Sequence, residues 1–330
     1  MILSTYERLV PPRISYLIFW PVVSFFVLII GEAIRRYYGA DKYWLIEVLY
    51  SMGIAFLPLL HIQFSHHFQK MMDEISPVFW SNPDKYQEWK LDRTTRIFTF
   101  SSLAPIAVTA TITVPGMLTI LLVGWPSRYW ALTIFALCFF SVILMFCGHG
   151  LYICLDLLAT LRELVSRPIT APFFMMEYKT ISKLQNYFAF VAAAVTFCYI
   201  WLLIAIWKSP YGLSRPSLQV WLTVLALYPV GLFVVSLQQI HVLMRNIKLL
   251  HLATINNEVQ GALKQFRSSK TKSLEEAERL EKLMEIQTKV ENMKEWPLGS
   301  QTSLTFLASF VLTFVTAITQ VIIAYLKIKQ

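Results

Sequence analysis

Charged residues are scarce in this chain of 330 amino acids. Asp, Glu, Lys and Arg make up 15% of it, whereas about a quarter of the residues of a soluble domain are charged. Apolar residues make up 56% of the chain, and the mean hydropathy is +0.54. This balance argues against a soluble fold, a disordered chain and a nucleic-acid-binding protein, and it predicts an all-α membrane protein.

Cysteines and enzyme motifs are scarce as well. The four cysteines lie in or at the ends of apolar segments, and no Cys-x-x-Cys pair occurs. A zinc site or a disulfide framework therefore has little support, and we interpret the four as small apolar side chains packed between helices. The motifs Gly-x-x-x-x-Gly-Lys, His-Glu-x-x-His and Gly-x-Ser-x-Gly are missing. We therefore expect no enzyme activity, no catalytic residues, no metal ion and no cofactor.

A transmembrane helix needs about 20 mostly apolar residues, and seven segments of the chain meet this requirement. They are 14–31, 43–61, 98–124, 129–152, 185–206, 219–244 and 302–326. The first has no small-residue cleavage site at its end, so we interpret it as a retained span and not as a signal peptide. The sequence therefore predicts a multi-pass protein of the cell membrane with seven transmembrane helices.

The distribution of Lys and Arg predicts the orientation, because cytoplasmic loops of membrane proteins carry an excess of both residues. If the N-terminus lies inside, the cytoplasmic segments hold 21 of the 29 basic residues and the outer segments hold 8. The net charge of +9 is then explained by the excess of basic residues in the cytoplasmic segments and does not indicate nucleic-acid binding. An inside N-terminus and an outside C-terminus are the reverse of a G-protein-coupled receptor, so this function is excluded.

The largest polar segment, 245–300, is expected to form two cytoplasmic amphipathic helices. Apolar residues of the first helix recur at helical spacing over 252–266. Those of the second helix are Leu283, Ile286, Val290 and Met293. Each stripe needs a surface to cover it, and neighbouring spans, other copies of the chain and the lipid surface are the alternatives. Because we expect no partner within one chain, we predict that the second stripe joins subunits beneath the membrane.

The chain therefore divides into three parts. They are a six-helix membrane domain (1–244) with cytoplasmic loops 62–97 and 153–184, the cytoplasmic amphipathic helices (245–300) and the last transmembrane helix (301–330).

Ionisable side chains in the spans offer few candidate sites. His61, His66 and His67 fall at an inner membrane end, where we expect their ring tips to reach the interface. His149 lies between two glycines in a predicted packing notch. The span centres carry no charge, since Glu47 and Asp156 lie near the interfaces. A secondary transporter, which usually has such charges, is therefore an alternative and not the leading prediction.

The last span carries a polar stripe. Thr302, Thr305, Ser309, Thr313, Thr316 and Gln320 recur at steps of 3 or 4 residues, which places them on one side of a helix. Two interpretations remain open for this stripe. It either forms hydrogen bonds between helices, or it lines a water-filled path in which hydroxyl and amide groups replace part of an ion's hydration.

The chain resembles the insect chemoreceptor superfamily of gustatory and odorant receptors in three features. These are seven spans with an inside N-terminus, a long cytoplasmic helical segment before the last span, and a motif in that span. Gustatory receptors have Thr-Tyr, five mostly hydrophobic residues and Gln-Phe, and this chain has Thr313-Phe314, five residues, then Gln320-Val321. Thr and Gln match at the family's spacing, whereas Phe stands for Tyr and Val for Phe.

This resemblance implies a ligand-gated, weakly selective cation channel in the membrane lipid. It implies a homotetramer with an inner anchor domain, and an unknown small-molecule ligand bound among the other spans. The pore-lining residues would be Thr305, Ser309, Thr313, Thr316 and Gln320. The alternative from a different class is a non-conducting membrane scaffold or sensor that acts through its cytoplasmic helices.

Overall fold

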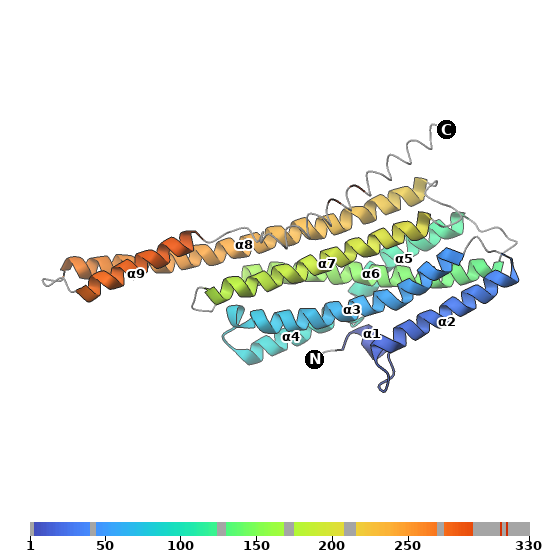
Figure 1. Cartoon of the computed structure of the whole chain (residues 1–330), viewed down its shortest axis with the longest axis horizontal. Helices are drawn as coiled ribbons and strands as arrows, with labels where there is room; N and C mark the ends of the chain where they lie inside the picture. The colour runs from blue at the N-terminus through green and yellow to red at the C-terminus, as the bar shows by residue number, and fades with distance from the viewer. Residues whose placement is uncertain are drawn as a thin grey trace.

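The computed structural model describes residues 3–39, 44–123, 130–167, 175–207, 216–268 and 274–292, together with Val311 and Val315. These residues form helices joined by short connections, and no strand occurs among them. The long helices lie side by side with similar axes, as Figure 1 shows. The elements are α1 (Thr5–Arg8), α2 (Tyr16–Tyr37), α3 (Trp44–Phe79), α4 (Pro83–Phe98), α5 (Leu103–Val123), α6 (Trp130–Ser166), α7 (Met175–Trp207), α8 (Pro216–Ser268) and α9 (Leu274–Glu291).

Five helices within the described residues are long and apolar enough to cross a membrane. They are Tyr16–Tyr37, Glu47–Phe79, Pro83–Leu118 (which includes α4 and most of α5), Leu137–Ser166 and Ser182–Leu202. Each overlaps one of the first five predicted spans, so an all-helical protein with several membrane-spanning helices is confirmed. The predicted sixth span is part of α8, and the predicted seventh lies almost wholly outside the described residues. The number of seven spans and their orientation remain predictions.

Helix α2 shows how one span divides between protein and lipid. Its buried residues include Trp20, Ser24, Val27 and Gly31, which recur at steps of 3 or 4 and therefore form one face. Large apolar side chains such as Phe25 and Ile29 are exposed on the rest of the helix. Such a wide apolar surface is unfavourable in water and suits contact with lipid chains.

Several helices are much longer than a membrane span requires. Helices α3 and α6 have 36 and 37 residues, or about 54 Å at 1.5 Å per residue, against a hydrocarbon core of about 30 Å. Helix α4 and the α8–α9 pair lie at one end of the bundle, where α8 projects beyond its neighbours (Figure 1). We call this the inner end because the predicted topology assigns these segments to the cytoplasm, and we call the opposite end the outer end.

Two clusters of buried apolar residues divide the core of the bundle. One includes Phe64, Met72 and Leu157 and joins α3, α4, α6, α7 and α8. The other includes Tyr6, Trp20 and Leu144 and joins α1, α2, α3, α5, α6 and α7. A helix of four residues at the N-terminus thus contributes one of the most completely buried side chains, Tyr6.

The two amphipathic segments that the sequence assigns to the cytoplasm pack on each other. Helix α8 continues without a break from the membrane part to Ser268, and α9 lies along it (Figure 1). Val290 packs with Ile255 and Val259, and Leu283 and Ile286 join the same cluster. The expectation that these stripes lack a partner within the chain is therefore wrong. Because α9 lies along α8, the two apolar stripes cover each other. The sequence pattern of one stripe alone does not reveal this pairing.

Candidate functional site

The predicted pore-lining residues Thr305, Ser309, Thr313, Thr316 and Gln320 lie outside the described residues, and so does Met293. Of the last span, the structure describes only Val311 and Val315, and both side chains are about half exposed. These two valines belong to the apolar side opposite the predicted stripe. The pore assignment is therefore a prediction from the sequence, and the sites below are built from buried polar groups elsewhere in the bundle.

A buried cluster of imidazole and phenol groups, the His–Tyr cluster, consists of Tyr6, His61 and His149. It joins α1, α3 and α6, although these residues are far apart in the sequence. The hydroxyl of Tyr6 lies 2.8 Å from Nδ1 of His149, and the Tyr6 and His61 rings have centroids 4.9 Å apart. The His149 side chain has no exposed surface. The cluster therefore ties the N-terminal turn to the middle of the bundle.

The small α1 helix is fixed by its own capping box and by two further contacts. The Ser4 hydroxyl accepts a hydrogen bond from the Glu7 amide, and the Glu7 carboxylate accepts one from the Ser4 amide. The other Glu7 oxygen lies 2.7 Å from Nε2 of His66. Thr5 accepts a hydrogen bond from the Phe100 amide at 3.2 Å. These contacts explain how a helix of one turn holds Tyr6 inside the bundle.

The prediction of interfacial histidines is wrong for His61, which is buried beside His149. The predicted packing notch around His149 is confirmed. A Cβ atom on Gly148 would lie 2.8 Å from the Thr109 backbone, and one on Gly150 would lie 3.1 Å from Nε2 of His61. The two glycines thus allow α5 and the His61 ring to approach α6 closely. Among the described residues, Nδ1 of His61 and Nε2 of His149 have no hydrogen-bond partner.

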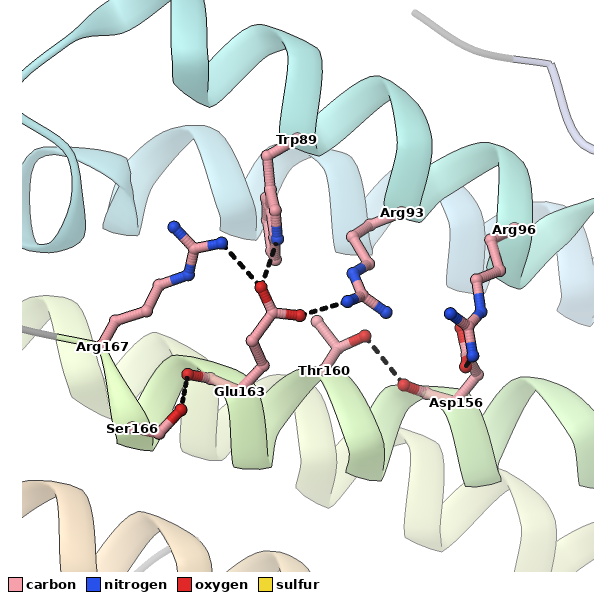
Figure 2. Close-up of polar contacts among 8 residues, drawn as sticks. All are labelled: Trp89, Arg93, Arg96, Asp156, Thr160, Glu163, Ser166 and Arg167. Atoms are coloured by element: carbon pink, nitrogen blue, oxygen red, sulfur yellow. Dashed lines mark hydrogen bonds and ion pairs between the residues drawn. The ribbon is translucent and has the colours of Figure 1, made fainter.

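Ion pairs join α4 to α6 at the inner end (Figure 2). The predicted fourth span ends at 152, and the continuation of α6 beyond it carries Glu163. This carboxylate accepts hydrogen bonds from Trp89 at 2.8 Å, from Arg93, and from Arg167 at 2.6 Å. The Arg167 guanidinium also lies 5.3 Å from the Trp89 ring centroid. A single carboxylate therefore organises three donors at the helix–helix contact.

The environment of Glu163 favours its charged form. Burial raises the pKa of a carboxyl group, but here the hydrogen bonds from Arg167 and Trp89 and the charge of Arg93 outweigh burial and lower the pKa of Glu163. About two turns earlier in α6, on the side of the predicted fourth span, Asp156 pairs with Arg96 at 3.1 Å. The ion pairs therefore form two successive layers along α6, which Figure 2 shows.

A third buried polar group lies at the outer end of α2 and α3. Arg35 of α2 is buried beside Glu47 of α3, and its Nε atom is 3.4 Å from a Glu47 oxygen. Arg35 also donates to Glu32, one turn earlier in its own helix. An ionisable residue buried at the membrane level is by default a candidate functional site. Glu47 is the strongest such candidate among the described residues because both of its oxygens lack a hydrogen-bond partner.

These sites differ in what they can do chemically. No group of three or more His, Cys, Asp or Glu residues within the described part of the chain is arranged to hold a metal ion. The α4–α6 ion pairs join these helices at the inner end, whereas the His–Tyr cluster leaves one nitrogen of each imidazole without a hydrogen-bond partner among the described residues. The Glu47 carboxylate is exceptional because it offers two acceptor oxygens without protein donors.

Comparison with known proteins identifies no relative. No family model, no curated protein and no solved structure matches the chain. Membership of the insect chemoreceptor superfamily therefore stays a prediction from the residues quoted above, and the chain is shown only to be an all-helical protein with several helices able to cross a membrane.

Proposed function

We propose that the protein is a ligand-gated, weakly selective cation channel of the cell membrane whose pore is lined by the last transmembrane helix. The observation that carries this proposal is the stripe of hydroxyl and amide groups from Thr305 to Gln320 in an otherwise apolar span. Uncharged polar groups can replace part of the hydration of a passing ion. Because no span carries a charge at its centre, strong selection by charge has no source there.

Assembly is the second part of the proposal. A single helix cannot enclose a pore, so several copies must bring their last helices together, and the family resemblance suggests four. The α8–α9 pair supports this idea, because it projects from the bundle and exposes the apolar side chains Leu274 and Met284. Leu283, Ile286 and Val290 pack with α8 within the chain, so the exposed side chains are the better candidates for contacts between copies.

Gating requires a ligand that binds the open arrangement more tightly than the closed one, since only differential affinity shifts the equilibrium. In this proposal the ligand binds among the outer halves of the first six spans. The closed and open states would differ in the packing of the last helix.

Purified protein in a planar lipid bilayer tests the proposal. Under a KCl gradient, the reversal potential of a weakly selective cation channel has the sign expected for cation permeation. Its magnitude is smaller than that of the Nernst potential of K⁺. Mass photometry in mild detergent tests assembly at the same time, because a tetramer has four times the chain mass of 38.2 kDa.

The alternatives predict different results in the same experiments. A scaffold or sensor would assemble without conducting, and the stripe would then form hydrogen bonds between helices. A secondary transporter would move solute at a slow, saturable rate without single-channel steps. A purely monomeric protein that does not conduct would contradict both parts of the proposal.

A further inference from the structure

The Glu47 carboxylate has too little positive charge around it. Its side chain is 4% exposed, and the 3.4 Å contact with Arg35 is longer than a hydrogen bond of 2.7–3.2 Å. Neither oxygen has a hydrogen-bond partner. A buried carboxylate is stable only when it is paired and hydrogen-bonded.

Arg35 divides its charge between two carboxylates and favours Glu32. Its Nε atom is 3.1 Å from a Glu32 oxygen, and one of its terminal nitrogens donates to the same oxygen. Arg36 binds the other Glu32 oxygen at 2.6 Å, but its own side chain is mostly exposed. The buried guanidinium of Arg35 therefore lies closer to Glu32 than to Glu47.

One feature of the position offsets part of the cost of burying a charged Glu47. It lies in the first turn of α3, where the partial positive charge of a helix N-terminus stabilises a carboxylate. A charged Glu47 needs a further cation, and the structure describes none other than Arg35 within ion-pair distance.

The Phe135 ring lies close to the Glu47 side chain. A Cβ atom on Gly31 would lie 3.4 Å from Cγ of Glu47 and 2.8 Å from Cζ of Phe135, so helices α2, α3 and α6 meet at this point. The Phe139 ring is 4.5 Å from the Phe135 ring. Tyr50, one turn further along α3, is buried beside Phe140. A carboxylate together with a nearby aromatic face is a combination that proteins use to bind organic cations.

The geometry points to a binding site for an organic primary ammonium ion at Glu47, reached from the outer end of the bundle. A primary ammonium has three N–H donors and can satisfy both carboxylate oxygens, which a quaternary ammonium cannot. An inorganic ion such as Ca²⁺ needs six to eight oxygen ligands, and Glu47 offers two. The partly exposed Glu32 and the exposed Trp44 mark the nearby surface from which a ligand would enter.

Equilibrium binding of radiolabelled 2-phenylethylammonium to the purified full chain in lipid nanodiscs tests this inference. The neutral analogue 2-phenylethanol and the trimethylated ammonium serve as competitors of the same shape. We expect saturable binding of the ammonium. The neutral alcohol should compete at least about tenfold more weakly, because it cannot make a charge-assisted hydrogen bond to the carboxylate. The trimethylated ammonium should also compete more weakly than the primary ammonium.

Variants of Glu47 and Phe135, with one control variant, test whether these two residues bind the ammonium. Glu47→Gln keeps the side-chain shape without the charge and should weaken binding at least about tenfold. Phe135→Leu keeps an apolar side chain without the π face and should weaken binding about threefold to tenfold. The control Glu281→Gln removes a carboxylate from the exposed side of α9 and should leave binding unchanged. If Glu47→Gln does not give a monodisperse protein, Glu47→Asp keeps the charge, and binding within a few-fold of wild type is expected.

The inference is overturned if wild-type protein does not bind the ammonium, if the neutral alcohol competes equally well, or if Glu47→Gln binds like wild type. It does not require conduction. Ammonium binding without current would contradict the channel proposal and support this site. Current without ammonium binding would support the channel proposal and contradict this site.

Discussion

Replacing Glu163 by Gln should separate α4 from α6 at the inner end. In wild type the carboxylate accepts hydrogen bonds from Trp89 and Arg93 of α4 and from Arg167 of its own helix. The amide of a Gln side chain keeps one acceptor oxygen for Trp89 but turns an NH₂ group toward a guanidinium. The variant therefore loses the ion pair between the helices and leaves two arginines without their shared counter-charge.

The expected magnitude follows from exposure. A hydrogen bond between charged groups contributes about 1.5–3 kcal/mol when buried. The Glu163 side chain is 27% exposed and Arg93 is 19% exposed, so solvent screening lowers this value. The pair with Arg167 within one helix adds about 0.3–0.5 kcal/mol. We expect Glu163→Gln to lower the free energy of unfolding by about 2 kcal/mol.

Reversible unfolding in mixed detergent micelles with increasing SDS, followed by tryptophan fluorescence, measures this change. The matched control is Glu285→Gln, which breaks a Glu–Lys pair within α9 at the surface, where the Glu285 side chain is 62% exposed. This control should leave the unfolding midpoint unchanged. Equal midpoints for Glu163→Gln and wild type would refute the view that this carboxylate holds α4 to α6.

The pH dependence of the same comparison gives an independent check. Because the pKa of Glu163 is lower in the folded protein than in the unfolded chain, its ionised form stabilises the fold above the unfolded value of about 4.3. That stability is lost as the pH falls through the folded pKa. The difference between wild type and Glu163→Gln should therefore be constant near neutral pH and shrink in acid.

Three further predictions test other parts of the fold. Tyr6→Phe removes the hydroxyl bonded to His149 and should cost about 1–3 kcal/mol of unfolding free energy, whereas Tyr16→Phe, at a ring that packs edge-on, should cost less in the same SDS titration. Val290→Ser, at a side chain that is 1% exposed, should loosen α9 and speed hydrogen exchange of its amides, whereas Lys282→Ser, at an exposed position of the same helix, should not. An epitope tag at the N-terminus should be inaccessible in intact cells and accessible after permeabilisation, and labelling of intact cells would contradict the predicted orientation.

Local sequence patterns predict the membrane helices well because each is specified by its own apolar residues. The first five predicted spans all fall on helices of sufficient length. The predicted cytoplasmic helix that begins at 245 also exists, since α8 continues to Ser268. What the patterns underestimate is length: α3 and α6 extend far past the apolar segments, because charged residues can continue a helix as readily as apolar ones.

Contacts between distant segments are much harder to predict. His61 and His149 meet only because α3 and α6 pack together, and neither local sequence indicates the other. The capping box of Ser4 and Glu7 was a visible signal for α1, but no apolar segment of helical length follows it. The sequence pattern predicts the stripe that contains Val290 but not its contact with α8, because that contact depends on how α9 lies relative to α8.

Cysteine accessibility in the last span tests the central claim most directly. In a chain without its native cysteines, Gln320→Cys and Thr316→Cys should each make the current sensitive to a hydrophilic methanethiosulfonate reagent. The control Phe314→Cys, on the apolar side of the same predicted helix, should give an insensitive current. If all three variants conduct and neither Gln320→Cys nor Thr316→Cys responds to the reagent, the last helix does not line the pore.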